Sequence, residues 1–100
     1  MKMYILVRDS IPLGFAVVGV AHASLAAYLK FHDTDAVKLW LAGPFAKAVC
    51  RVSDADFEKA KEAGDYVVIT ESALGGQETT VAFKPRDEWP KGFRFMKLLC

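Results

Sequence analysis

The segment from residue 14 to residue 31 most constrains the fold, because it is apolar on nearly every side and rich in small residues. Its glycines and alanines include Gly14, Ala16, Gly19, Ala21, Ala23, Ala26 and Ala27. This composition is typical of a helix that packs closely on a sheet, and the apolar pattern predicts that the helix is largely buried. The run is broken by His22 and Ser24, and we expect it to be too short for a bilayer span. No membrane helix is therefore expected.

The rest of the chain predicts alternating strands and helices. Runs rich in β-branched and aromatic residues predict strands at about residues 2–8, 46–52, 66–70 and 79–83. An N-cap at Asp33 or Thr34 predicts a short helix that ends at Gly43-Pro44, and Ser53 predicts the start of a third helix, at about Asp54 to Ala63. Gly75-Gly76 predicts the turn between the last two strands.

This order of elements predicts the fold class. The two helical connections favour parallel pairing of the strands they join, and the short last connection favours an antiparallel hairpin. We therefore expect an α/β fold, a three-layer α/β/α arrangement with a small mixed four-stranded sheet. A chain of 100 residues is long enough for one core only, so residues 1–100 are interpreted as a single domain.

Composition and charge exclude several function classes. The formal net charge is +1, with basic segments on either side of an acidic stretch at residues 53–78. A balanced charge does not favour non-specific binding to long nucleic acids. Cys50 and Cys100 match no metal or disulfide spacing, so both are expected to be free thiols, and no metal or cofactor motif is found. The first residues do not look like a secretory signal, which favours a cytoplasmic protein.

A few polar residues are candidates for chemistry, each with a structural alternative. The loop of residues 8–14 follows the first strand and precedes a helix, a common ligand position in α/β sheets. Arg8 is a candidate anion contact there, or it simply pairs with Asp9. His22 is a candidate acid or base, or a hydrogen-bonded core histidine. Glu71, at the end of the third strand, borders the same cleft or is merely exposed.

Aromatic residues give a further alternative. Trp40, Trp89, Phe93 and Phe95 have the ring faces that stack on nucleobases, with Arg94 and Lys97 close by in the sequence. Core packing is the more common role for such residues. Phe93, Phe95, Leu98 and Leu99 also give the tail more apolar surface than a small domain buries alone, which predicts a homodimer.

The run from Tyr4 to Asp9, Gly14, and the run from His22 to Tyr28 resemble the type II peptidyl-tRNA hydrolase family. That family opens with a strand that ends in arginine, then a Gly-Lys helix start and a His-Ala signature. The similarity continues through residues 48–54 and 79–85, so it covers almost the whole chain. The tail is more similar to a divergent branch of peptidyl-tRNA hydrolase domain-containing proteins.

The resemblance implies a cytoplasmic hydrolase that cuts the ester between a peptide and tRNA, with peptidyl-tRNA as partner. His22 and Glu71 then correspond to catalytic positions. The substrate contacts would be Arg8, Asp9, Gly14, Phe15 and Gly19. Ester hydrolysis requires an activated water and a stabilised oxyanion.

The chain departs from the family pattern at three of these positions. Phe15 replaces the family's lysine, and Gly19 replaces its glutamine. Glu71 falls near the family's aspartate, but Ser-Ala-Leu follows it where the family has a glycine and a threonine. Lys84 or Arg86 are the cations considered as substitutes for the lysine. The departures favour the alternative, a catalytically degenerate binding or assembly module. A small-molecule-binding domain is the third hypothesis.

Overall fold

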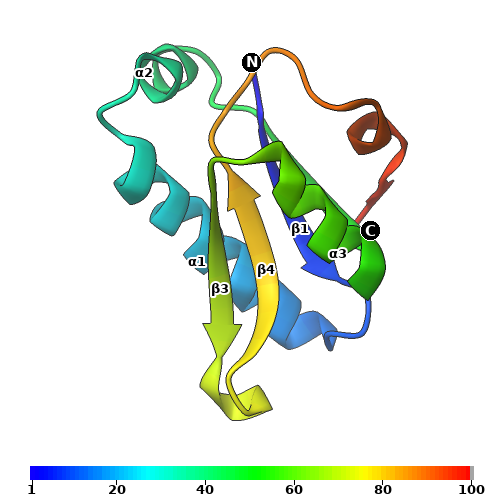
Figure 1. Ribbon diagram of the computed structural model, residues 1–100. Coiled ribbons are helices and arrows are strands. Elements are labelled where there is room, and N and C mark those ends of the chain that lie inside the picture. The colour runs from blue at the N-terminus through cyan, green and yellow to red at the C-terminus, as the bar shows by residue number, and fades with distance from the viewer. Residues whose placement is uncertain (100) are drawn as a thin grey trace.

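A computed structural model describes residues 1–99 as one mixed sheet with helices on both faces (Figure 1). Its α-helices are α1 (Leu13–Phe31), α2 (Asp35–Ala42) and α3 (Asp54–Ala60). Its strands are β1 (Met3–Arg8), β2 (Lys47–Val52), β3 (Tyr66–Glu71), β4 (Gln77–Phe83) and β5 (Lys97–Leu98). Three 3₁₀ turns complete the described elements: η1 (Lys61–Ala63), η2 (Ser72–Leu74) and η3 (Lys91–Phe95).

The sheet has the strand order β3-β4-β1-β2-β5. β1 pairs with β2 in parallel, and every other neighbouring pair is antiparallel. β1 is the central strand and is buried from Met3 to Val7. The carboxyl ends of β1, β2 and β3 therefore lie at one edge of the sheet, where the sequence predicted a ligand site.

The expected α/β class and mixed sheet are confirmed, but the predicted number of strands is wrong. The sheet has five strands, because the tail returns along β2 and pairs Lys97 with Arg51 and Leu98 with Cys50. Two residues are too few to produce a hydrophobic period, so pairing with a neighbour defines this strand, and its own sequence does not. The third helix is also shorter than expected, since its last residues, Lys61–Ala63, form η1.

Short polar residues start the two smaller helices. Thr34 Oγ1 accepts a hydrogen bond from the Val37 N–H at 3.3 Å, and Ser53 Oγ accepts one from the Asp56 N–H at 3.1 Å. Each bond satisfies a backbone donor that the first helical turn leaves free. The N-cap predicted at Ser53 is therefore confirmed, and of the two candidates Asp33 and Thr34 the cap of α2 is Thr34.

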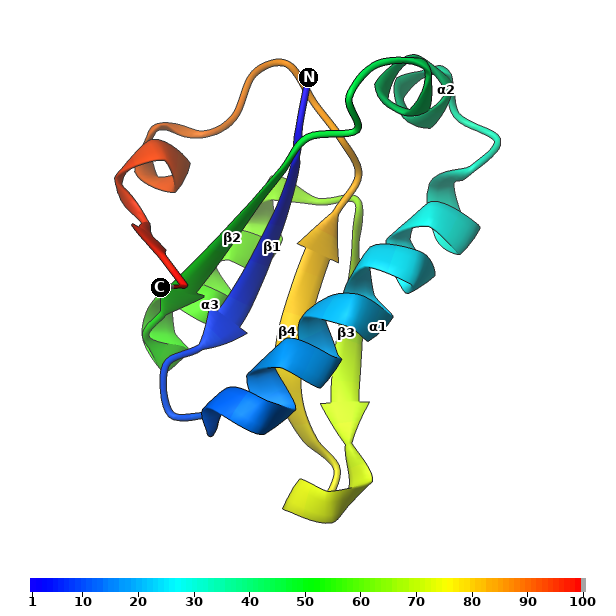
Figure 2. The ribbon, with the colours of Figure 1, turned by 180° about the vertical axis from the view of Figure 1, so that it is seen from behind.

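Helix α1 lies across one face of the sheet, over β1, β4 and β3 (Figure 2). Its buried residues form a single stripe of mainly small side chains: Ala16, Gly19, Ala23, Ala27 and Phe31. The prediction that this helix is largely buried is wrong. Its remaining sides are exposed or partly exposed, because no other described element packs against them.

The other face of the sheet is covered by α3 and the tail (Figure 1). Its core contains aromatic rings, among them Phe83, which packs edge-to-face on Trp89 and Phe93 with ring centroids 5.9 and 5.4 Å apart. Tyr4 contacts the same two rings from β1. Trp89 and Phe93 thus serve as core residues, and Trp40 is buried on the α1 face. Of the four candidate stacking residues, Phe95 remains well exposed.

Candidate functional site

The two residues predicted to be catalytic, His22 and Glu71, do not contact each other in this structure. His22 is exposed on α1 and makes no hydrogen bond or ion pair with another residue in the range 1–99. The Glu71 carboxylate accepts a hydrogen bond from the Ala73 N–H at 3.0 Å and so caps η2. Glu71 therefore has a local structural role, and no polar contact joins it to His22.

Arg8 extends from the carboxyl end of β1 to the α3 side of the sheet. Its guanidinium carbon lies 4.3 Å from the centre of the Phe57 ring, and the side chain is only 14% exposed. It lies close to three carboxylates, those of Asp54 at 2.9 Å, Glu58 at 2.9 Å and Glu78 at 4.0 Å. Arg8 Nε is buried without a hydrogen-bond partner in the described chain. With its charge already compensated, Arg8 is a poor contact for an external anion.

Lys61 completes this network of charges. Its ammonium lies 2.7 Å from Glu78 and 3.0 Å from Glu58. Partial burial lowers the pKa of Lys61, but the hydrogen bonds and negative charges of Glu78 and Glu58 outweigh that effect and raise it above its ordinary value. The network holds α3, η1 and β4 together. It is an arrangement that stabilises the fold, with no free cation for a substrate.

Of the three substrate contacts expected in the first turns of α1, Phe15 and Gly19 serve packing. Phe15 is half-buried against a cluster that contains Val7 and Ile11. Gly14 is exposed, and a Cβ added there would meet nothing within 4 Å. At Gly19 a Cβ would collide with Thr80 Oγ1 and lie 3.1 Å from Thr79 Oγ1, so the glycine allows the helix to approach β4. This part of the helix contains no amine.

Lys84 and Arg86, the two cations considered as substitutes for the family's lysine, make their contacts away from α1. Lys84 forms an ion pair with Asp65 at 3.2 Å. Arg86 donates to the Ala63 carbonyl at 3.4 Å and lies over the Trp89 ring. Neither contact involves α1. The structure therefore gives neither residue the role that the family's lysine would have had.

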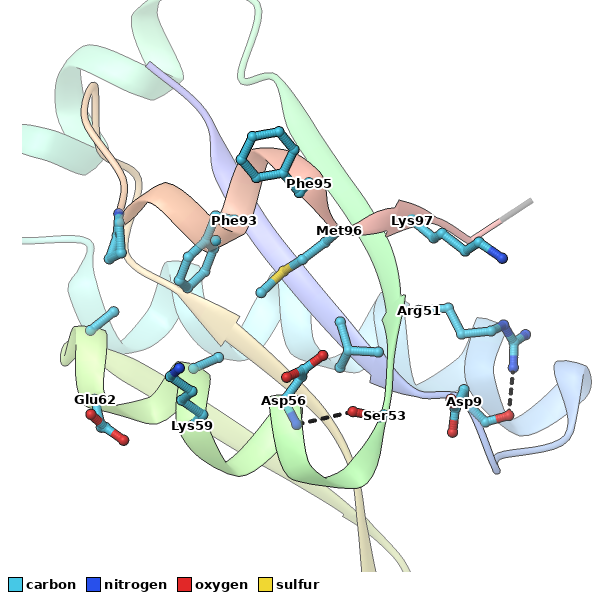
Figure 3. A pocket seen from close by; sticks show the side chains of 15 residues that line it. Asp9, Arg51, Ser53, Asp56, Lys59, Glu62, Phe93, Phe95, Met96 and Lys97 are labelled. Atoms are coloured by element: carbon cyan, nitrogen blue, oxygen red, sulfur yellow. Dashed lines mark hydrogen bonds between the residues drawn. The ribbon is translucent and has the colours of Figure 1, made fainter.

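Asp9 lies at one end of an open groove of about 640 Å³ between α3 and the tail (Figure 3). The loop that contains it is held by Arg51, whose Nη1 donates to the carbonyls of Asp9 at 3.1 Å and Ile11 at 3.5 Å. The groove begins at the carboxyl ends of β1 and β2, as expected for an α/β sheet, but on the face opposite to α1. Asp9 and the exposed His22 are thus on different sides of the molecule.

The groove combines an apolar side with a charged one. Phe93 and Met96 line it from the tail, and Asp56, Lys59 and Glu62 line it from α3 and η1 (Figure 3). Charges of both signs alternate, so the groove selects neither an anion nor a cation. In the described residues no group of three metal-ligating side chains occurs. Sequence reasoning missed this groove, because its two sides lie far apart in the chain.

Cys50 is buried in the core beneath this groove, and within residues 1–99 it has no disulfide partner. Burial raises the pKa of its thiol, and the charge of Lys2 lowers it by less. The thiol therefore stays protonated near neutral pH and is a poor nucleophile. Cys100, the other expected free thiol, lies outside the described residues.

The least expected feature is the outer side of α1, where large apolar side chains face solvent. The exposed fractions are 63% for Leu13, 55% for Val17, 44% for Val18, 59% for Leu25 and 60% for Leu29. Small residues face the core and large ones face outward, which is the reverse of the usual pattern for a helix on a sheet. The sequence signal for this surface was the apolar pattern on all sides of the helix, but that pattern was interpreted as evidence that the helix is buried.

Two further observations describe this surface. A shallow apolar hollow of about 400 Å³ lies between α1 and the tail, lined by Val17, Val20, Val49, Leu98 and Leu99. By length and composition alone, α1 also passes as long and apolar enough to cross a membrane, as core helices of soluble proteins do. The expectation that the apolar run is too short for a span is therefore wrong, since the helix extends over 19 residues.

Comparisons of the chain with protein-family models and with curated proteins find no match.

Proposed function

We propose that this chain is a binding and assembly module without a hydrolytic centre, and that the outer side of α1 is its contact surface. The observation that carries the proposal is the exposure of Val18, Leu25 and Leu29 on a helix whose inner side is made of small residues. Isolated exposed leucines are common on proteins. Several large aliphatic side chains exposed together on one side of a helix are typical of an interaction site.

The energetics of this row favour a partner. Burial of apolar surface is worth about 25 cal/mol per Å², so each large aliphatic side chain transferred from water into a contact gains roughly 1–2 kcal/mol. α1 has a single lysine and no acidic residue, so little charge would have to be desolvated. The outer side of α1 therefore offers a gain in free energy that the isolated domain does not use.

Hydrolysis of peptidyl-tRNA receives less support. Phe15 fills an apolar cluster at the position of the family's lysine, and the Arg8 guanidinium is compensated by carboxylates. The Glu71 carboxylate is occupied by a backbone N–H. A general base, a free cation and an oxyanion donor around one point are what the reaction needs. The described side chains do not supply this set.

The fold proposed for the module is that of the type II peptidyl-tRNA hydrolases. The support is the sequence resemblance, together with a mixed α/β sheet in which the matched Gly14 is the second residue of α1. β5 is an addition to the four strands expected. A shared fold carries over without its activity when the site residues have changed.

The decisive experiment measures release of the blocked amino acid from purified N-acetyl-aminoacyl-tRNA. We expect no release above the uncatalysed rate by the folded protein. The His22→Ala variant is run beside it as the control for contaminating hydrolase. Turnover that this variant abolishes would overturn the proposal and restore the hydrolase. Equal turnover by both proteins would identify a contaminant and leave this chain without activity.

A second variant tests whether the missing lysine is the main departure. Phe15→Lys restores the amine at the start of α1, where the side chain is half-buried. Because Gly19, Glu71 and Arg8 are also committed to structural contacts, we expect this change alone not to generate hydrolysis. Activity that appears in Phe15→Lys would show that the rest of the catalytic site is intact.

A further inference from the structure

We propose that the partner of the outer side of α1 is a second copy of this chain, packed antiparallel so that a two-fold axis passes close to Ala21 and His22. This inference rests on the proposed function and adds the identity of the partner. It also replaces the tail as the expected interface of a homodimer. Three properties of α1 carry it: the spacing of its outer residues, their sizes and their lack of charge.

The spacing is that of a helix that packs on another helix. A row of exposed positions is separated by steps of three and four residues: Gly14, Val18, then Ala21 and His22, then Leu25 and Leu29. All of these positions are exposed to solvent. Steps of four and three keep one row of side chains toward a neighbouring helix over several turns. The buried stripe of the helix occupies the opposite side.

The sizes along the row fit an antiparallel copy. With the axis near Ala21, Leu25 of one copy lies opposite Val18 of the other, and Leu29 lies opposite Gly14. A large side chain therefore meets a smaller one or none at each level, and the small Ala21 at the centre permits close approach of the helices. Gly14 has free space around its Cα, which leaves room for Leu29. A two-fold interface needs this kind of self-complementarity.

The charges also allow self-pairing. No acidic residue occurs in α1, and its lysine, Lys30, donates through Nζ to the Tyr66 carbonyl at 2.7 Å, on the side toward β3. When two copies pair along this row, no two acidic side chains and no two lysines are therefore brought together. Antiparallel helices also place the positive end of each dipole beside the negative end of the other.

A membrane surface fits these observations less well. Helices that lie in a membrane interface carry lysine or arginine along their polar side, which contacts anionic headgroups. α1 has only Lys30, and its other side is covered by the sheet. A lipid surface would therefore gain apolar contact without electrostatic attraction. The self-complementary sizes would have no use there.

The size of the surface predicts a weak dimer. A helix of 19 residues is about 28 Å long and about 10 Å wide, which gives a footprint of roughly 300 Å² on each copy. Stable interfaces bury about 800 Å² per partner. The hollow between α1 and Leu98 adds apolar area at one side of the row. We expect dissociation constants in the micromolar range or above.

The experiment is sedimentation of the whole chain at concentrations from about 10 µM to about 1 mM, the range in which a micromolar complex forms and dissociates. Two variants are compared. Leu25→Lys places a charge in the row, and Phe95→Lys places one on the tail, where Phe95 is 74% exposed. Both sites are exposed, so both variants should fold, and thermal unfolding of each checks this.

We expect a dimer that Leu25→Lys weakens at least tenfold and that Phe95→Lys leaves unchanged. A dimer that is weakened only by Phe95→Lys would place the interface on the tail and overturn the proposal. A monomer at every concentration would also overturn it. Binding of the monomer to vesicles, lost in Leu25→Lys, would identify a lipid surface as the partner instead.

Cross-linking tests the antiparallel geometry directly. In a Cys100→Ser background, Ala21→Cys places a thiol near the proposed axis, and we expect rapid formation of a disulfide-linked dimer under mild oxidation. Glu62→Cys, exposed on the opposite side of the sheet, is the control and should cross-link slowly. Equal rates would contradict the proposed axis. The hydrolysis assay stays independent, so a monomer without turnover refutes only the dimer, and turnover that depends on His22 refutes the proposed function.

Discussion

The two faces of the sheet are packed with side chains of different size. On the face of α1, small residues bring the helix close to the strands, and Gly19 sits against Thr79 and Thr80. On the face of α3 and the tail, aromatic rings fill the space, and the charges of Arg8 and Lys61 lie over the Phe57 ring. The helix on the first face packs closely through small residues, and the second face combines large rings with charged side chains.

This difference explains where surface remains for a partner. The aromatic face buries most of its large side chains inside the domain, and the exposed large apolar side chains of the tail are Phe95 and Leu98. The α1 face uses small side chains inside and leaves its leucines and valines outside. The stability of the fold should therefore depend mainly on the aromatic face, and association on the α1 face.

The largest effect is expected on the aromatic face. Phe83→Ala removes a fully buried ring that packs against Tyr66, Trp89 and Phe93. The cavity and the lost contacts should lower the free energy of unfolding by about 3–5 kcal/mol. Urea denaturation measures it. A loss below about 1 kcal/mol would mean that the aromatic face is not the main source of stability.

A smaller effect is expected from crowding the α1 face. Gly19→Ala places a methyl group against Thr80 Oγ1, and the required shift of helix and strand should cost about 1–3 kcal/mol. Gly14→Ala, in the same helix, meets nothing within 4 Å and should stabilise by roughly half a kcal/mol through helix propensity. Denaturation of both variants tests the close approach directly. If both substitutions stabilise, the helix packs less tightly than described.

The smallest effect concerns the charges over Phe57. Because interactions with Glu78 and Glu58 raise the folded pKa of Lys61 above its ordinary 10.5, the charge on Lys61 adds stability below that pH. That contribution is lost as the pH rises through the raised folded pKa. The stability difference between the wild type and Lys61→Met, about 1 kcal/mol or less for so partly solvated a network, should therefore be constant near neutral pH and shrink in strongly alkaline solution.

Denaturation midpoints at several pH values measure this difference. Lys59→Met is the matched control, because Lys59 is exposed on the neighbouring α3. The same comparison for Lys59→Met gives the baseline for removing a lysine that forms no ion pair with Glu58 or Glu78 in the described chain. A difference for Lys61→Met that grows at high pH would reverse the sign of the proposed coupling.

The candidate site was less predictable than the fold. Arg8 was expected to bind an anion, but Asp54, Glu58 and Glu78 come from later elements, and only the packing of α3 and β4 on β1 brings them to it. His22 was placed correctly on a helix, but periodicity does not determine whether that side of the helix meets a neighbour. The groove beside Asp9 likewise needs the tail to fold back along β2.

The sequence by itself determined the order of elements from β1 to β4, the N-cap at Ser53, the cap of α2 to within two residues, and the small-residue helix. These features follow from hydrogen bonds and side-chain periods within a few residues. The tertiary structure decided the fifth strand, the partners of Arg8 and the exposure of the outer side of α1. Those depend on which distant segments pack together, because an apolar side chain is buried only where another element covers it.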